Sequence, residues 1–389
     1  MPKHSFTGWM MRRLFFIPLA GLLFLVPLPS LHAAERVITV EGYNVNYSPF
    51  YDGPMLVNSK AKKLYCGRGY SDGEYDQGLY VYDISADGEI TGTDERILPN
   101  SPDPVQPPPP GGGPTYYFRV VYGIAVSPDG RKLYLGLCGC RNSEAKPLVV
   151  YDLDEKGEPT GKPRSYEIAK GLKNIQSLLL HPKGNVIYTV ASSTEGICSI
   201  PLVDGEPSMT ATNFAIGSVY NYQLIPNDTF DKLLVPGYPS RVQLVTVGAS
   251  GGLESKDDLM FNVGEPKAWL AATRVDHTLF FALDNKLWSW TLDKDWHPVG
   301  KPVVHADIPA LRVMNGVQSS LYVVLGEFDH PKGAKEPVFV SSRVARYKPD
   351  AQGKIGKPEF LSDIFSHKRV MNLTVDESSG VIYVSTWPN

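Results

Sequence analysis

Apolar and polar residues alternate over short stretches of this chain, and each stretch ends at a turn signal. Residues 122–126 form an apolar run, Ser127-Pro128-Asp129-Gly130 follows as a turn, and residues 132–136 form a returning apolar run. Pro presets the first central torsion angle of such a turn, and Gly accepts the left-handed one. No long segment has a sustained apolar period of 3.6 residues. The pattern therefore predicts antiparallel β-strands without helices.

A strand that runs into a Gly turn recurs along the chain. Residues 81–92 return as residues 150–161 and as residues 346–356, with weaker copies at residues 199–207 and 290–300. An apolar pair, mostly ending in an aromatic residue, precedes each unit and occurs seven times: Leu64-Tyr65, Leu133-Tyr134, Ile187-Tyr188, Leu233-Leu234, Leu279-Phe280, Leu321-Tyr322 and Ile382-Tyr383. Successive pairs are 42 to 69 residues apart, which brackets the roughly 40–50 residues of a four-stranded propeller blade. The sequence predicts an all-β, seven-bladed β-propeller.

The two ends of the chain complement each other. The last unit, residues 369–387, holds only two strands, whereas residues 36–40 form a single strand before the first unit. Pairing them would cover open strand edges. We therefore expect residues 35–389 to form one propeller domain, closed by an N-terminal strand in the last blade. The Pro-rich segment 99–114 is predicted to be an exposed loop insert, and the charged segment 327–335 a second loop.

Residues 1–34 have the pattern of a signal peptide. Three basic residues precede an apolar run at residues 14–26, and small residues follow at Ala33-Ala34. Prolines interrupt the run, which is short for a membrane span of ~20 residues, and no Cys follows it for lipid attachment. We predict cleavage between Ala33 and Glu35 and a secreted or periplasmic protein with no stable membrane anchor.

Net charge argues against a nucleic-acid partner. The chain has 38 basic and 41 acidic residues. Removal of residues 1–34 takes away three basic and no acidic residues, which leaves 35 against 41 and a net charge of −6. An acidic protein of this kind does not attract a phosphate backbone.

The four cysteines allow two interpretations. In an oxidising compartment Cys66 can bridge to Cys138 or Cys140 of the next blade, with Cys198 left free and buried. Alternatively, all four are reduced and pack as small apolar residues. A zinc site is not expected, because Cys-x-Cys lacks the usual spacer and no His pair lies nearby. Neither a metal nor a cofactor is predicted, since the chain has no Cys-x-x-Cys-His haem motif.

Five of the six segments that lead into predicted inner strands carry a cation. A repeat architecture places equivalent positions on one rim, so these side chains could focus positive potential on a small anion at the channel mouth. The alternative is that they are ordinary solvated cations at loop ends. The cations are Arg119, Lys173, Lys267, Arg312 and Arg369. Nearby aromatic and amide residues complete the predicted ligand-binding set: Tyr122, Tyr222, Trp269, Asn174, Asn315 and Asn372.

Catalytic motifs are absent from the sequence. It contains no Gly-x-Ser-x-Gly, no His-Glu-x-x-His and no phosphate-binding loop. Two histidines at predicted blade junctions, His305 and His367, and two carboxylates near the predicted rim, Asp52 and Asp363, are the candidate acid–base residues. For each of them the alternative is a structural hydrogen bond.

Residues 127–134 and 151–160 resemble the lactonase family of seven-bladed β-propellers, which includes 6-phosphogluconolactonase and the carboxy-muconate cyclases. Tyr188-Thr189-Val190 and residues 383–386 are also similar to the Tyr-Val-Thr-Asn repeats of bacterial surface propellers. The resemblance spans residues 36–389 and implies the propeller fold. In the cyclases His, Arg and Glu act around the channel. Arg119, Arg312 and Arg369 are the positions that would match the arginines, and the chain has no clear counterpart of the His and Glu.

Two functions follow as hypotheses. The first is an exported lactonase-like hydrolase that opens the lactone of an anionic sugar or a carboxylic acid at the channel mouth. The second is a non-catalytic propeller that binds a small anion, a glycan or a protein partner on its rim.

Overall fold

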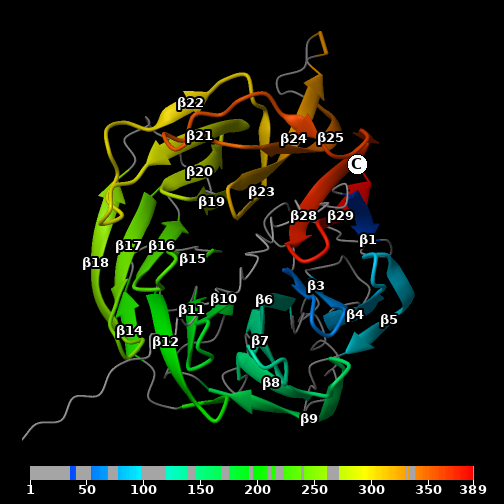
Figure 1. The fold of residues 1–389 in the computed structure, drawn as a ribbon, viewed down its shortest axis with the longest axis vertical. Coiled ribbons are helices and arrows are strands. Elements are labelled where there is room, and N and C mark those ends of the chain that lie inside the picture. Colours follow the sequence, from blue (N-terminus) through cyan, green and yellow to red (C-terminus); the bar gives the residue numbers. More distant parts are fainter. Residues whose placement is uncertain are drawn as a thin grey trace, which may run out of the picture. The chain divides into compact units, whose positions relative to one another are not determined.

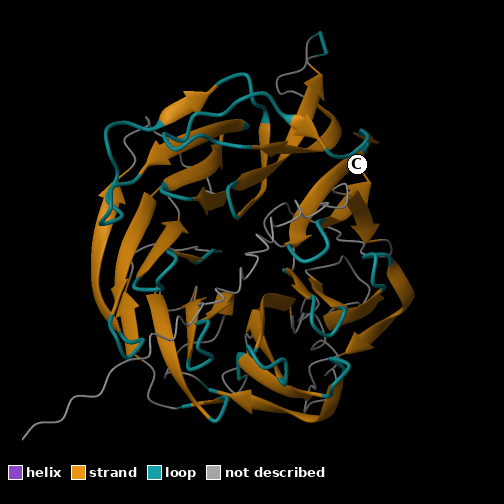
Figure 2. Ribbon diagram, in the orientation of Figure 1, coloured by secondary structure: helices purple, strands orange, loops and turns teal. Residues whose placement is uncertain are grey.

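Within the computed structural model, strands and the turns between them account for the whole of the described chain (Figure 2). Contacts divide the chain into the units Met1–His32 and Ala33–Asn389, and every described residue belongs to the second. No helix in the described part is long and apolar enough to cross a membrane. The described residues are 36–40, 54–68, 78–97, 120–138, 146–167, 175–191, 196–208, 212–215, 223–237, 241–260, 271–329, 331–332 and 338–388.

The strands form seven sheets that follow one another around a ring, as the sequence predicted (Figure 1). Blade 1 contains β2 (Met55–Asn58), β3 (Lys63–Arg68), β4 (Gly78–Ile84) and β5 (Ile90–Ile97). Blade 2 contains β6 (Val120–Val126), β7 (Lys132–Cys138), β8 (Leu148–Leu153) and β9 (Pro159–Tyr166). Blade 3 contains β10 (Ile175–Leu180), β11 (Val186–Ala191) and β12 (Gly196–Val203), and both β13 (Glu206–Pro207) and β14 (Thr212–Ala215) pair with β12.

The later blades repeat this order. Blade 4 contains β15 (Ile225–Pro226), β16 (Lys232–Gly237), β17 (Arg241–Val247) and β18 (Leu253–Met260). Blade 5 contains β19 (Ala271–Val275), β20 (Thr278–Leu283), β21 (Lys286–Thr291) and β22 (Val303–His305). Blade 6 contains β23 (Ala310–Val317), β24 (Ser320–Asp329) and β25 (Val338–Tyr347), and both β26 (Glu359–Phe360) and β27 (Phe365–Ser366) pair with β25.

Blade 7 closes the ring with the N-terminal strand. It contains β28 (Lys368–Asp376), β29 (Val381–Pro388) and β1 (Arg36–Val40), and β28 contacts β2 of blade 1. The predicted pairing of the first and last strands is confirmed, from Arg36 opposite Val381 to Val40 opposite Ser385. The strands run parallel to each other, and the described part of this blade has three strands rather than the four we expected.

The hydrophobic core is divided among the boundaries between blades. Seven buried clusters occur in the described residues, and each takes its side chains from two neighbouring blades. Tyr65 and Val121 share one such cluster between blades 1 and 2. Because strand side chains alternate between the two faces of a sheet, each blade contributes to two clusters.

The blades have two distinct ends. At the turn face, the inner strand turns into the second strand and the third strand turns into the outer one. At the opposite end, the loop face, the second strand passes to the third and each blade passes to the next. Described connections at the loop face are Asp284-Asn285 and residues 306–309 and 361–367, all in blades 5 to 7. The Pro-rich insert 99–114 lies outside the described residues.

A tyrosine hydrogen bond links several blades at the turn face. Tyr65 Oη donates to the Gly157 carbonyl of blade 2 at 2.7 Å, and Tyr134 Oη donates to the Gly205 carbonyl of blade 3 at 2.9 Å. Tyr383 Oη of blade 7 donates to the Gly88 carbonyl of blade 1 at 2.7 Å. These glycines have φ of 76–87°, and a Cβ there would lie 3.0–3.4 Å from the hydroxyl. Glycine is therefore required by both the turn and the contact.

The residue after each of these three glycines is a glutamate that forms an ion pair with the preceding blade, and Glu89 pairs with Arg36 of blade 7 at 2.6 Å. Lys63 Nζ pairs with Asp83 of its own blade at 2.5 Å and with Glu158 of blade 2. Lys132 Nζ pairs in the same way with Asp152 at 3.1 Å and with Glu206 of blade 3 at 2.5 Å. Burial alone would lower the pKa of Lys63, but its two carboxylate partners raise it. The recurrent Gly-Glu in the sequence therefore connects blades as well as forming turns.

The boundary between blades 4 and 5 uses apolar packing instead. Blade 4 has Leu234 at the tyrosine position, and blade 5 has Trp296 at the glycine position, where it keeps a positive φ of 69°. Both side chains belong to one buried cluster. Arg274 lies 5.2 Å from the Trp296 ring centroid and donates from Nε to the Pro226 carbonyl at 2.5 Å. The loss of the tyrosine hydroxyl thus coincides with the gain of a large apolar side chain.

Cys66 and Cys198 are free, buried thiols. The alternative in which Cys66 forms a disulfide bond is therefore not realised, and Cys66 packs as a small apolar residue between blades 7 and 1. Burial raises the pKa of both thiols, that of Cys198 to about 12. Cys140 and the side chain of Cys138 lie outside the described residues.

Candidate functional site

Most of the predicted cation ring lies outside the described residues. This applies to Arg119, Lys173, Asn174, Tyr222, Lys267, Trp269 and the catalytic candidate Asp52. Arg312 is described only as a backbone position in β23. The convergence of these side chains on one channel mouth stays a prediction.

Four of the seven inner strands, β6, β10, β23 and β28, have a register irregularity near their loop-face end, whereas β2, β15 and β19 pair regularly over their described residues. The register shifts at Tyr122 in β6, at Gln176 in β10 and at Met371 in β28, and β23 has two extra residues between Ala310 and Met314. Arg312 falls within that last bulge. Bulges redirect side chains and are frequent beside functional sites. Two predicted site residues, Tyr122 and Arg312, therefore occupy equivalent irregular positions in different blades.

Arg369 packs across the boundary between blades 6 and 7. Its Cζ atom lies 4.8 Å from the ring centroid of Phe339, a buried residue of β25. Asn372 also lies in β28, where its Oδ1 accepts from the Leu373 backbone N–H at 2.7 Å. Asn315 lies in β23 opposite Tyr322 and is partly buried. The described members of the predicted set are thus built into strands of blades 2, 6 and 7.

The histidine candidates lie in two different places. His305 is in β22, the outermost strand of blade 5, with Nε2 2.8 Å from the Ser289 hydroxyl. Burial lowers the pKa of His305. His367 is exposed, has a φ of 52° and donates its backbone N–H to the Val340 carbonyl at 3.0 Å. A positive φ is uncommon outside glycine and occurs at functional sites. Asp363 is exposed in the connection between β26 and β27.

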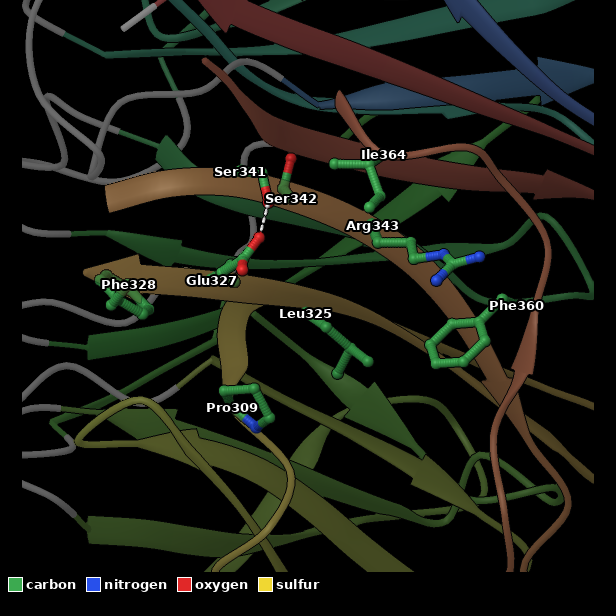
Figure 3. A pocket seen from close by; sticks show the side chains of 10 residues that line it. Pro309, Leu325, Glu327, Phe328, Ser341, Ser342, Arg343, Phe360 and Ile364 are labelled. Atoms are coloured by element: carbon green, nitrogen blue, oxygen red, sulfur yellow. Dashed lines mark hydrogen bonds between the residues drawn. The ribbon is translucent and has the colours of Figure 1, made fainter. Parts of the chain in front are cut away.

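A pocket of about 510 Å³ opens at the loop-face end of blade 6, beside the connection that carries Asp363 and His367 (Figure 3). Its size is in the range of small-molecule sites. The pocket is lined by Pro309, Leu325, Gly326, Glu327, Phe328, Ser341, Ser342, Arg343, Phe360 and Ile364.

The pocket exists because β24 and β25 are long. Each has 10 residues, and their pairing continues to Asp329 opposite Val338. We predicted that residues 327–335 form a charged loop, which is wrong for residues 327–329, because they continue β24. The charged residues and the following His330-Pro331 resemble a loop sequence, but exposed and less exposed side chains continue to alternate to the end of β24. The available signal was Phe328 between Glu327 and Asp329, because an apolar residue alternates there with two charged ones.

Two opposite charges lie on the same face of this hairpin. Glu327 is directly opposite Ser341, and Leu325 is opposite Arg343, so Glu327 and Arg343 are diagonal neighbours with backbone positions roughly 7–8 Å apart. Figure 3 shows Glu327 with Ser341 at one end of the pocket and Arg343 against Phe360 at the other.

Each of these charges is held by a different neighbour. Ser341 Oγ donates to Glu327 Oε2 at 2.7 Å. Arg343 donates from Nε to the Ser362 carbonyl at 3.1 Å, and its Cζ atom lies 3.8 Å from the Phe360 ring centroid. In the part of the chain that the structure describes, no ion pair joins Glu327 to Arg343. The arrangement holds an acceptor and a multidentate donor apart, with space between them for a ligand.

Comparison with known proteins supports the fold. No family model matches the chain, and no curated protein matches it. The structure is similar to a candidate 6-phosphogluconolactonase from Bacteroides fragilis, with a TM-score of 0.52, 13% identity and coverage of 85% of this chain and 89% of that one. It is also similar to a protein from Lactobacillus plantarum (TM-score 0.53, 12% identity, 79% and 84% covered) and to hydrazine synthase from Kuenenia stuttgartiensis (0.50, 13%, 70% and 76%).

At these identities the similarity concerns the fold alone, and the names of the neighbours differ widely. The predicted resemblance to lactonase-type propellers is confirmed at that level. The chain is a seven-bladed β-propeller, and its fold is similar to that of the lactonase-type propeller from Bacteroides fragilis.

Proposed function

We propose that this propeller is a hydrolase that opens a lactone in the blade 6 pocket, between Glu327 and Arg343. The observation that supports the proposal is the separation of these two charges on one strand face, each fixed by its own neighbours. A carboxylate that is not neutralised by the nearby guanidinium remains able to accept a proton. The ring of Phe360 and the Ser362 carbonyl restrict the position of the Arg343 guanidinium, whose planar N–H groups can then meet a ligand.

The residues have complementary roles in this reaction. Glu327 acts as the general base and takes a proton from water while the water oxygen attacks the lactone carbonyl carbon. Arg343 donates hydrogen bonds to the carbonyl oxygen as it gains negative charge. The ring C–O bond then breaks, and the leaving oxygen takes the proton back from Glu327 to give a hydroxy acid. Ser341 is a positioning residue, because its hydrogen bond orients the carboxylate.

Substitution of the two charged residues tests the proposal. A panel of γ- and δ-lactones assayed with the purified domain should give turnover that falls roughly 100-fold or more in Glu327→Gln and Arg343→Gln. Matched controls are Glu359→Gln, an exposed carboxylate of the same blade, and Arg131→Gln, an exposed arginine of blade 2. Equal losses in the controls, or turnover unchanged in both pocket variants, would reject this site.

We also propose that the protein is exported, on the pattern of residues 1–34. The full chain expressed in a Gram-negative host should be recovered outside the cytoplasm, shortened by about that segment when its mass is measured. A chain without residues 1–34 serves as the cytoplasmic control. Recovery of the full-length mass in the cytoplasm would contradict export.

A further inference from the structure

The blade 6 pocket has an apolar wall beside its charged pair. Pro309, Leu325, Phe328, Phe360 and Ile364 all line it. Phe360 is 48% exposed and Ile364 is 53% exposed. Isolated exposed apolar residues are ordinary, but apolar side chains gathered in a concave site favour an apolar ligand group. Part of the pocket is therefore suited to a hydrocarbon substituent.

The electrostatics of the same pocket disfavour a strongly anionic ligand. Its lining contains one carboxylate, Glu327, and one guanidinium, Arg343, so the opposite charges balance. A phosphate dianion would gain one cation and face one anion, so the pocket offers it no net positive charge, and this mismatch disfavours such a ligand.

We infer that the substrate of this site is an uncharged lactone bearing an alkyl or aryl substituent. This inference rests on the function proposed above and specifies its substrate class. The ester group lies between Glu327 and Arg343, and the substituent lies on Ile364 and the exposed part of Phe360. Phosphorylated sugar lactones are poor substrates, since they bring two negative charges and hydroxyl groups to an apolar wall.

Ile364 is the residue that isolates this effect. Phe360 also supports the Arg343 guanidinium, so its replacement would disturb the catalytic pair together with the wall. Ile364 has no ring or polar group with which to hold either charged residue, and it is largely exposed. Val203, 64% exposed in β12 of blade 3, provides a matched apolar control away from the pocket.

The first experiment measures kcat/KM for δ-lactones whose unbranched side chain grows from none to five carbons. Burial of each methylene should raise kcat/KM roughly two- to fourfold in the parent protein. Ile364→Ser should flatten this increase, while Val203→Ser should behave as the parent. The inference would be overturned, even with hydrolysis established, if kcat/KM of the parent did not change with side-chain length. It would also be overturned if 6-phosphogluconolactone were the preferred substrate.

A second experiment separates this inference from the proposed hydrolysis. Alkyl-substituted δ-lactams retain the ring carbonyl and resist opening, so calorimetry can follow their binding directly. Affinity that rises with chain length and loses this dependence in Ile364→Ser supports the apolar site even if no lactone is hydrolysed, in which case only the hydrolase proposal fails. Lactams that bind no better as the chain lengthens would reject the substituent site.

Discussion

The turn face and the loop face of this propeller are built in different ways. At the turn face, one unit recurs from blade to blade, and its parts connect blades through hydrogen bonds such as that from Tyr65 to Gly157 and ion pairs such as Lys63 with Glu158. At the loop face, connections differ in length and sequence, and the blade 6 pocket depends on β24 and β25, which are the longest of the described strands.

This difference separates stability from function. Residues that repeat have a role that every blade needs, which is attachment to the next blade. Residues that occur once, such as Glu327 and Arg343, contribute nothing to a repeated contact and are available for chemistry. Variants of the turn face should therefore change the free energy of unfolding. Variants of Glu327 and Arg343 should change turnover, and their free energy of unfolding should stay within about 0.5 kcal/mol of that of the parent.

The largest effect is expected from loss of ring closure. Deletion of residues 36–40 removes β1, exposes the edge of β29 and opens the cluster that contains Val40. The domain should lose several kcal/mol of stability and aggregate through the open edge. Thermal unfolding and light scattering report both changes. A deletion variant that melts with the parent would show that β1 is not needed for closure.

A smaller loss is expected from the buried lysine between blades 1 and 2. Lys63→Met leaves Asp83 and Glu158 without their shared cation, and should cost about 2 kcal/mol, because the two carboxylates are partly solvated. Lys60→Met is the control, since that exposed ammonium reaches only the Asp129 carbonyl at 3.2 Å. In urea unfolding, the free energy of unfolding of the control should lie within about 0.5 kcal/mol of that of the parent. Similar losses in both variants would remove the inter-blade role of Lys63.

The tyrosines provide an internal comparison among equivalent positions. Removal of the hydroxyl in Tyr65→Phe, Tyr134→Phe or Tyr383→Phe should cost about 1 kcal/mol each, because a hydrogen bond to a glycine carbonyl is lost. Tyr188→Phe should be neutral or stabilising, since the buried Tyr188 hydroxyl has no hydrogen-bond partner among the described residues. If chemical unfolding gave the same change in unfolding free energy for all four variants, the assigned hydrogen bonds would be contradicted.

The smallest effect concerns acid sensitivity at the boundary between blades 7 and 1. Burial alone would raise the pKa of Asp376, but hydroxyl donors on Ser59, Ser379 and Ser378 outweigh it and lower the pKa. A depressed folded-state pKa gives stability that is present above the unfolded pKa of about 3.9 and is lost as the pH falls through the folded value. Asp376→Asn should therefore be less stable than the parent at pH 7, with the difference shrinking below pH 4 in urea titrations. A constant difference between pH 7 and pH 3 would contradict this.

The fold could be predicted because it depends on local patterns that repeat. Strand alternation, turn residues and unit spacing are properties of short segments, and they specified seven blades and the closing strand. The partner of Glu158 could not be found in this way, because Lys63 belongs to the preceding blade and no local pattern joins them. From the sequence we predicted Glu327 to lie in a loop, because the charged residues that follow it are typical of loops. The pocket depends on which side chains share a strand face across a hairpin, and only the register supplies that.

The parallel pairing of β1 with β29 determines the order in which the molecule can be completed during synthesis. β1 leaves the ribosome before every other described strand, yet its partner is the last strand of the chain. Loop-closure entropy grows only slowly with length, so this separation affects equilibrium stability little, but such distant contacts form late. β1 must therefore remain without its partner until β29 has emerged.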